Sequence, residues 1–168
     1  MFPRSADQLP YFDADAETIT YDYFHGYRLL QKDNLEPAFP FGFGLSYTSF
    51  QYGNVTIDKA KARPDEKIQI SVDVSNVGAR AGAEVVQLYI GYEGSSVERS
   101  IMDLKGFRRV ELAPAETSTI RFVLSAQDLA FFDIAHRKWI VEPITYLASV
   151  GPYADSRVLT SATFTITE

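Results

Sequence analysis

Hydrophobic and polar residues alternate along the chain from about Val55 onward, which places every second side chain on one face of a strand. The stretch IQISVDVSNVG shows the pattern best, and its residues 76–78 close it as a turn. Four further stretches repeat the alternation: AEVVQLYIGY, STIRFVL, ITYLASV and RVLTSATFTIT. The residues predicted to face a shared core are Ile68, Ile70, Val72, Val74, Val86, Leu88, Ile90, Tyr92, Ile120, Phe122, Leu124, Ile144, Tyr146, Ala148, Val150, Val158, Ala162, Phe164 and Ile166.

Three shorter stretches, NVTID, LKGFRRVEL and RKWIVE, are also typical of strands, which gives about eight strands in all. Turn residues separate them, and no stretch between them has a sustained helical period. SAQDLAFFD has room for a single helical turn. Alternating strands without crossover helices predict an all-β fold, an antiparallel sandwich in which each sheet has one face in water.

Residues 1–50 follow neither a strand period nor a helix period. They contain four prolines, the acidic run DADAE, and two aromatic stretches, YDYFHGYRLL and FPFGFGLSYTSF, the second without any charged residue. Loops longer than about 15 residues without secondary structure are uncommon in compact domains. We therefore expect an irregular N-terminal extension, residues 1–50, shaped to lie against another part of the protein, followed by a sandwich domain, residues 51–168.

The composition excludes several classes of function. The chain has 168 residues, 46% of them hydrophobic, which suits one domain with a sizeable core, and its net charge of −6 argues against a nucleic-acid partner. No apolar run approaches the roughly 18 residues of a membrane span, and the first residues lack the apolar core of a signal peptide. We expect a soluble chain with no membrane partner and of undetermined localisation, because a protein without cysteine tolerates either redox environment.

Five stretches together closely resemble the C-terminal part of family-3 glycoside hydrolases, the β-glucosidase and β-xylosidase group. They are FHGYRLL, PAFPFGFGLSYTSF, VSNVGARAGAEVVQLYIG, LKGFRRVEL and KWIVEP, and they occur in the order of the family. The resemblance covers nearly the whole chain. It implies an immunoglobulin or fibronectin type III-like sandwich after GLSYT, in agreement with the alternation, and it makes residues 1–50 the linker and tail of a preceding α/β domain.

The resemblance also implies that this chain is not itself an enzyme. The catalytic aspartate of the family and its acid/base carboxylate lie upstream of the matched part. We therefore expect a non-catalytic accessory domain that stabilises the catalytic domains of a parent enzyme, its intramolecular partners. That enzyme would hydrolyse terminal β-D-glucosides, or β-xylosides, by a retaining mechanism.

Two residues depart from the pattern of the family. Ile144 stands in VEPITY where the family usually has glycine, so the turn there must form without the residue that best tolerates positive φ. Ser100 replaces a common proline in VERSIMDLKGF, which predicts a less restrained loop.

The residues themselves do not suggest chemistry. Glycoside hydrolysis needs two carboxylates about 5–10 Å apart, but every candidate is interpreted as a solvated surface acid. His25 is predicted to pack into the aromatic cluster and His136 to lie in a turn, and no GxSxG, GxGxxG or GxxxxGK[ST] motif is present. We predict no catalytic, cofactor-binding or metal-binding residues. The carboxylates considered are Asp13, Asp15, Glu17, Glu84, Asp103, Glu111, Asp133 and Glu142.

A stand-alone carbohydrate-binding module is the alternative, because ten tyrosines and one tryptophan could stack on sugars. Most aromatic residues of the strands fall on the predicted core face, and Trp139 is expected to be buried in its short strand. Tyr52, Tyr89, Tyr153 and some rings before position 50 remain as a possible platform for a carbohydrate partner.

The aromatic residues before position 50 form the predicted interdomain docking site, since rings in such number seek burial. Arg28 could pair with a carboxylate across that interface. If the partner domains were absent, the same segment would be disordered or would favour homo-oligomers. The predicted docking residues are Tyr21, Tyr23, Phe24, His25, Tyr27, Arg28, Phe39, Phe41, Phe43 and Tyr47.

Overall fold

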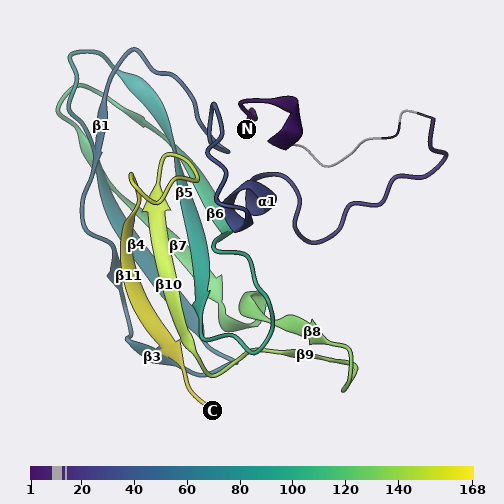
Figure 1. The fold of residues 1–168 in the computed structure, drawn as a ribbon. Helices are drawn as coiled ribbons and strands as arrows, with labels where there is room; N and C mark the ends of the chain where they lie inside the picture. Colours follow the sequence, from purple (N-terminus) through teal and green to yellow (C-terminus); the bar gives the residue numbers. More distant parts are fainter. Residues whose placement is uncertain (9–12, 14) are drawn as a thin grey trace.

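A computed structural model describes residues 1–8, 13 and 15–168 and shows an all-β sandwich with an irregular N-terminal extension (Figure 1). The extension contains two short helices, η1 (Ala6–Gln8) and α1 (Tyr27–Lys32). The remaining elements are β1 (Phe50–Tyr52), β2 (Thr56–Ile57), β3 (Lys61–Ala62), β4 (Lys67–Asn76), β5 (Gly82–Glu93), β6 (Asp103–Leu112), β7 (Thr117–Ser125), η2 (Ala126–Leu129), β8 (Phe131–Asp133), β9 (Lys138–Ile140), β10 (Thr145–Gly151) and β11 (Thr160–Ile166).

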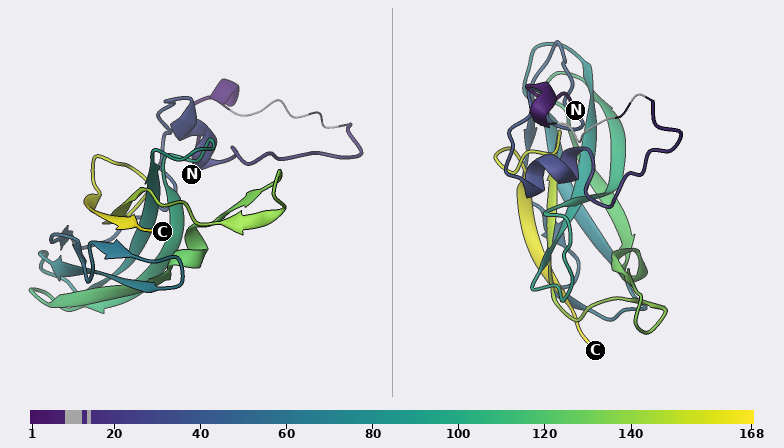
Figure 2. Two further views of the ribbon diagram at one scale, coloured as in Figure 1. Left: turned by 90° about the horizontal axis from the view of Figure 1, so that it is seen from below. Right: turned by 45° about the vertical axis from the view of Figure 1, so that its right-hand side comes forward.

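Two sheets make up the sandwich. In the first, β4 pairs with β7 along one side and with β1 and β2 along the other. The second has the order β3-β11-β10-β5-β6, and all its pairs are antiparallel except β3 with β11. β8 and β9 pair only with each other, and this hairpin leaves the body of the sandwich (Figure 2).

The core lies between the sheets and confirms the predicted alternation. On β4, Ile68, Ile70 and Val74 are 0% exposed. On the facing sheet, Tyr146 stacks on Phe164 with ring centroids 5.4 Å apart. Tyr92, Ile144 and Ala162 are only half-buried but pack against this core. All the other residues expected to face inward are buried, with one exception.

That exception is Val158, which is 38% exposed, so its predicted core position is wrong. β11 begins only at Thr160, and Val158 lies in the preceding turn, where its backbone N–H donates to Asp155. The alternation of RVLTSATFTIT begins before the first residue that pairs with β10. The pattern alone therefore placed the beginning of this strand too early in the chain.

The prediction that Trp139 is buried is also wrong, because its side chain is 69% exposed. β9 belongs to neither sheet, so the indole ring has no core to enter. It packs instead against Phe132 of the same hairpin, edge to face, at 5.5 Å between centroids. The helical turn expected in SAQDLAFFD is confirmed as η2.

Both departures from the family pattern have a local explanation. Ile144 keeps a negative φ, and its backbone N–H donates to the Glu142 carbonyl at 2.9 Å, so this turn needs no glycine. Ser100 is 3% exposed, and its hydroxyl donates to Asp103 Oδ1 at 2.6 Å. Hydrogen bonds therefore restrain the loop that was expected to be less restrained.

Candidate docking surface

The N-terminal extension packs on the outer face of β5, opposite to the core (Figure 1). Tyr89 points out of the sandwich on that face and is 0% exposed, because Tyr27 and Phe41 of the extension cover it. The ring of Tyr27 stacks on Phe41 at 4.8 Å and meets Tyr89 edge to face at 6.3 Å. The expectation that Tyr89 is free for sugar stacking is therefore wrong. Strand periodicity identified the outer face correctly but could not reveal what covers it.

Gly42 allows the extension to approach β5 closely. Its φ is +83°, and a Cβ atom there would lie 2.4 Å from Oε1 of Gln87. The Gln87 side chain is itself buried and donates to the carbonyl oxygens of Gly42 and Pro152. Next to it, the backbone N–H of Ala154 donates to the Phe41 carbonyl at 2.9 Å. A side chain at position 42 would separate these contacts.

Asp103 at the start of β6 binds the extension to the sandwich. Its carboxylate, 4% exposed, accepts from Arg28 Nε at 2.7 Å, Ser100 Oγ at 2.6 Å, Tyr92 Oη at 2.9 Å and Tyr23 Oη at 3.4 Å. Burial alone would raise the pKa of Asp103, but the hydrogen bond from Ser100 and the charge of Arg28 outweigh it and lower the pKa. Arg28 thus already has a carboxylate partner within this chain.

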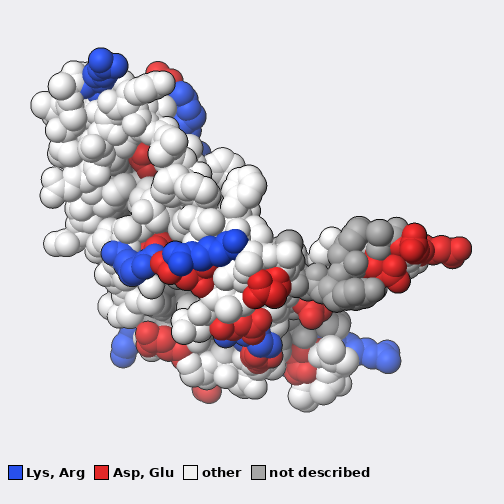
Figure 3. Space-filling model, turned by 45° about the horizontal axis from the view of Figure 1, so that its top comes forward, with Lys and Arg blue, Asp and Glu red and all other residues white. Residues whose placement is uncertain are grey.

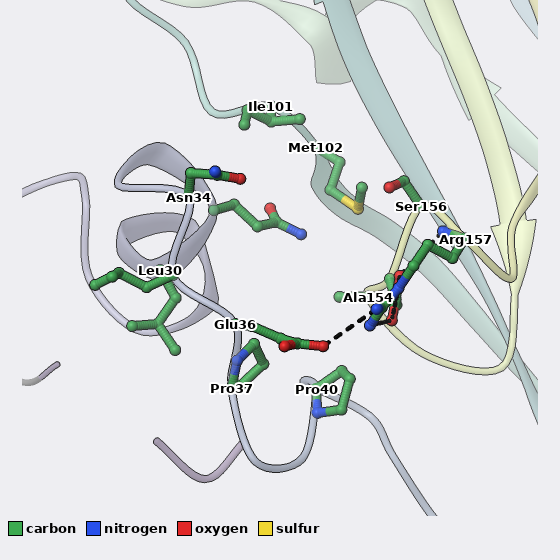
Figure 4. A pocket seen from close by; sticks show the side chains of 13 residues that line it. Leu30, Asn34, Glu36, Pro37, Pro40, Ile101, Met102, Ala154, Ser156 and Arg157 are labelled. Carbon is green, nitrogen blue, oxygen red and sulfur yellow. Dashed lines mark hydrogen bonds and ion pairs between the residues drawn. The ribbon is translucent and has the colours of Figure 1, made fainter. Parts of the chain in front are cut away.

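A crevice of about 470 Å³ remains between the extension and the loops of the sandwich (Figure 4). Leu30, Met102 and Ala154 form its apolar floor. At its rim, Glu36 pairs with Arg157 at 3.1 Å, drawn as a dashed line, and with Arg4 at 2.8 Å. These exposed ion pairs contribute little stability, so the buried contacts of Asp103 and Tyr89 dominate the attachment.

The structure divides the ten predicted docking residues into two groups. Tyr27, Arg28 and Phe41 face the sandwich and are half-buried, and Phe24 is half-buried beside Lys32. The other six side chains are exposed: Tyr21, Tyr23, His25, Phe39, Phe43 and Tyr47. His25 contacts Tyr21 at 6.0 Å, so its ring joins the cluster without being buried.

Several of the exposed rings form one continuous apolar face. Phe39 contacts Phe2 at 6.3 Å and Phe43 at 5.2 Å between ring centroids, and Phe43 contacts Tyr153 at 5.4 Å. Leu45 and Tyr47 follow in the chain, and both are 92% exposed. The sequence-based list missed Leu45, which stands within an aromatic motif, and Phe2, which stands in none. We call the three contacting rings and the two exposed residues that follow them in the chain the N-terminal face: Phe2, Phe39, Phe43, Leu45 and Tyr47.

The β8–β9 hairpin carries a second exposed apolar group that the sequence did not reveal. Phe132 is 46% exposed, Ile134 82% and Trp139 69%. We call these three residues the hairpin patch. In a segment this short, alternation cannot distinguish a strand that enters a core from a hairpin that projects into solvent.

The carboxylates depart from their interpretation as surface acids. Asp103 and Glu142 are 4% and 5% exposed, and Glu84 is half-buried, so that interpretation is wrong for these three. Glu142 accepts from Ser95 Oγ at 2.6 Å and from the backbone N–H of Ser96 at 2.7 Å. Burial raises the pKa of Glu142, but these hydrogen bonds outweigh it and lower the pKa. Both buried carboxylates are ionised acceptors that fix loops, and neither suits a general acid.

The remaining candidates are accounted for locally. Asp13, Asp15, Glu17 and Glu111 are exposed, as expected of surface acids. Asp133 accepts from the backbone N–H of Ala135 at 2.9 Å and from His136, which confirms the turn predicted there. Within residues 1–8, 13 and 15–168, no three His, Asp or Glu side chains are grouped as metal ligands.

Charge and hydropathy on the surface agree with the composition. On the face drawn in Figure 3, acidic and basic side chains are mixed over the body, and further acidic side chains lie at the end of the projecting N-terminal segment. Among the described parts of the chain, no helix is long and apolar enough to cross a membrane.

Glu84 provides a pH test of the structure. Burial raises its pKa, and the hydrogen bond from Tyr52 Oη, 2.9 Å from Glu84 Oε1, offsets only part of that effect. A folded pKa above the unfolded one means that ionisation costs stability once the pH exceeds the unfolded pKa of about 4.3. Glu84→Gln is therefore expected to raise the urea midpoint at pH 7, with the gain disappearing below about pH 4. Glu111→Gln, at an exposed ion pair with Arg109, is the control; an equal gain there would contradict the assignment.

The sandwich described above matches a known type of domain, and the chain is similar to known proteins that contain it. The family model that matches is described as a fibronectin type III-like domain and covers residues 84–154, from β5 to the loop after β10. The chain is 41% identical over 130 residues to a β-glucosidase of Bacteroides ovatus, covering 77% of this chain and 17% of that protein. It is 36% identical over 165 residues to a β-xylosidase of Formosa agariphila, covering 98% of this chain and 22% of that protein.

A solved structure agrees with these relatives. The β-D-glucoside glucohydrolase of Trichoderma reesei superposes with a TM-score of 0.84 at 28% identity, covering 98% of this chain and 26% of that one. The chain is thus a fibronectin type III-like domain, homologous to a non-catalytic part of family-3 glycoside hydrolases. It spans about a fifth of the length of the curated relatives described above, 17% and 22%.

Proposed function

We propose that the chain is the C-terminal accessory domain of a β-glucosidase-like enzyme and that it stabilises the catalytic domains that precede it. One observation carries the proposal: the extension is bonded to the sandwich on one side and uncovered on the other. Tyr27, Arg28 and Phe41 contact β5 and β6, whereas Leu45 and Tyr47 are 92% exposed. One apolar side of the extension packs on the sandwich, and another apolar side is left uncovered. This arrangement suits a segment that lies between two domains.

The grouping of exposed rings on the N-terminal face supports a protein partner. Soluble monomers rarely expose continuous apolar patches of more than a few hundred Å². Within the N-terminal face, the rings of Phe2, Phe39 and Phe43 contact one another, and Leu45 and Tyr47 follow in the chain, each 92% exposed. Residues 1–50 would serve as the linker and tail of the preceding α/β domain, and residues 51–168 as the accessory sandwich. Alone in solution, the same face would favour homo-oligomers.

The names of the relatives supply the proposed reaction of the parent enzyme. They include a β-glucosidase and a β-xylosidase, so the parent would hydrolyse terminal β-D-glucosides, or β-xylosides, with retention of configuration. The carbohydrate-binding alternative has less support than the sequence suggested. Tyr89 is covered by the extension, and Tyr52 is half-buried with its hydroxyl bonded to Glu84. Of the three strand and loop tyrosines, Tyr153 alone remains, half-buried beside Phe43, together with exposed rings before position 50 such as Tyr47.

The test measures binding of the 168-residue chain to the catalytic part of the Bacteroides ovatus relative, prepared without its own matched region. Titration calorimetry is expected to show a complex, and the catalytic part is expected to keep its activity longer at elevated temperature when the chain is added. Replacing Leu45 and Tyr47 together by serine should weaken binding at least about tenfold, because apolar anchors dominate such interfaces.

The matched control is Val123→Ser. Val123 is 65% exposed on β7, which belongs to the sheet of β4 and not to the five-stranded sheet that contains β5. This variant is expected to bind like the original chain. Absence of a complex, or equal weakening by both changes, would contradict the proposed docking. Light scattering on the chain alone supplies a second readout, since the Leu45 and Tyr47 changes should also reduce self-association.

A further inference from the structure

A groove of about 410 Å³ lies beside the hairpin patch. Its lining includes Tyr23 of the extension and Phe132 and Trp139 of the hairpin. Two basic residues, Arg99 and Lys105, also line it. The hairpin and the N-terminal segment project to the same side of the sandwich in Figures 1 and 2. The groove is lined by residues of both segments.

The groove carries an excess of positive charge. Asp103 is its buried acid, but Arg28, Ser100 and two tyrosines already satisfy that carboxylate. Arg99 has a side chain only 8% exposed, and its Nη1 has no hydrogen-bond partner among the described residues. The nearest carboxylate oxygen, of Glu142, is 3.6 Å away from that atom. That contact is an ion pair with a buried carboxylate, and Arg99 Nη2 donates to the Leu129 carbonyl at 3.1 Å. The positive charge of the groove that a partner could still neutralise is therefore mainly that of Lys105.

Two further charged residues, Lys105 and Glu98, contribute to the net charge of the groove. The ammonium group of Lys105 donates to the Asp128 carbonyl at 2.7 Å and keeps two other N–H groups for an acceptor. Glu98 also lines the groove, but its carboxylate is 65% exposed and pairs with Lys32 at 2.8 Å. The floor therefore favours a ligand that brings a negatively charged acceptor.

The walls of the groove are apolar and uncovered. Tyr23 is 43% exposed and Phe132 46%, and Ile134 and Trp139 extend the apolar surface along the hairpin. A neutral sugar could stack on Trp139, but it would bring no charge for Lys105 and no apolar group for Ile134. A protein segment with a carboxylate side chain between aliphatic neighbours satisfies the floor and the walls together.

We infer that this groove receives an Asp or Glu side chain of the preceding domain, whose apolar neighbours cover the hairpin patch. The inference rests on the proposed function and adds a second contact to the N-terminal face. The occupant follows from the charge of Lys105 and from the position of the groove, because Tyr23, one of its residues, belongs to the extension that the proposed function places against that domain.

The experiment uses the single tryptophan of this chain, Trp139, as a reporter. The 168-residue chain is labelled with 5-fluorotryptophan and titrated with the unlabelled catalytic part of the Bacteroides ovatus relative, while calorimetry measures binding independently. Docking at the hairpin is expected to shift the single ¹⁹F resonance and to remove its solvent isotope shift. Binding by calorimetry with an unchanged resonance would overturn the inference and leave the proposed function intact. Absence of binding would overturn both.

Variants test the carboxylate. Lys105→Glu is expected to weaken binding about tenfold or more, since it places like charges together in a partly buried site. Lys61→Glu makes the same charge change on exposed β3 and is expected to have little effect. Equal affinities of the two variants would overturn the carboxylate occupant. Trp139→Ala adds a variant whose exposed ring contributes little to the fold, so unaltered binding by it would count against the hairpin contact. A resonance shift with cellobiose alone would favour a sugar and overturn the protein occupant.

Discussion

Asp103→Ala is expected to lower the free energy of unfolding by about 3–5 kcal/mol, because breaking a buried ion pair leaves the remaining charge without compensation. The change removes the acceptor of Arg28, Ser100 and Tyr92 at once. It also releases the extension from the start of β6. Urea denaturation measures the loss, and amide hydrogen exchange of α1 is expected to speed up more than that of β4.

The control for this prediction is Glu98→Ala. Glu98 makes an ion pair of similar length with Lys32, 2.8 Å, but with 65% of its side chain exposed. Exposed pairs of this kind contribute about 0–1 kcal/mol. If Asp103→Ala and Glu98→Ala lowered the free energy of unfolding by similar amounts, burial would not be the reason that the Asp103 contacts stabilise the fold.

The same carboxylate predicts a pH dependence. The folded pKa of Asp103 is lowered, so its contribution to stability is complete above the unfolded pKa of about 3.9 and is lost as the pH falls through the folded pKa. The original chain should therefore lose stability below about pH 4 more steeply than Asp103→Ala. Parallel curves for the two proteins would contradict the assignment.

Tyr89→Ala is the second change with a large expected effect, a loss of about 3–5 kcal/mol. The ring is 0% exposed on the outer face of β5, where it supports Tyr27 and Phe41. Removing it opens a cavity beneath the extension without touching the core between the sheets. Differential scanning calorimetry measures the loss, and proteolysis between residues 23 and 45 is expected to become faster while the sandwich stays intact.

Two further variants separate the ring from its hydroxyl. The Tyr89 hydroxyl donates to Gln87 Oε1 at 2.5 Å, so Tyr89→Phe is expected to cost about 1 kcal/mol. Phe107→Ala removes an aromatic ring that is 67% exposed on the neighbouring strand, and it should stay within about 0.5 kcal/mol of the original chain. A loss from Tyr89→Ala no larger than that of Phe107→Ala would mean that the extension is not held by this ring.

The period of two was sufficient to predict the core. Ile68, Val74 and Phe164 are buried as the alternation required, because each strand of a sandwich turns one face inward whatever its partners are. The same period says nothing of what lies outside a sheet. Tyr89 is buried by Tyr27 and Phe41, which lie far earlier in the chain, and Trp139 is exposed because its hairpin joins neither sheet of the sandwich. Both errors concern neighbours that are distant in sequence.

The buried carboxylates show the same limit for the candidate site. Asp103 stands in a stretch with an ordinary surface composition, and its partner Arg28 is 75 positions away. Glu142 is fixed by Ser95, 47 positions away. The aromatic motifs near position 40 did indicate a docking segment, but only the structure separates Phe41, which faces the sandwich, from Tyr47, which faces away. Side-chain direction in an irregular segment has no period from which it could be inferred.

The parallel pairing of β3 with β11 has a consequence for biosynthesis. β3 (Lys61–Ala62) pairs with Thr165 and Ile166 of the last strand, so the five-stranded sheet cannot close until that strand is available. Pairings between segments so distant in sequence form slowly, and nascent chains fold from the N-terminal side at about 5–20 residues per second. Domains encoded before this one would already be folded by then. In a parent enzyme of the proposed kind, the sandwich would therefore assemble against a surface that had already folded.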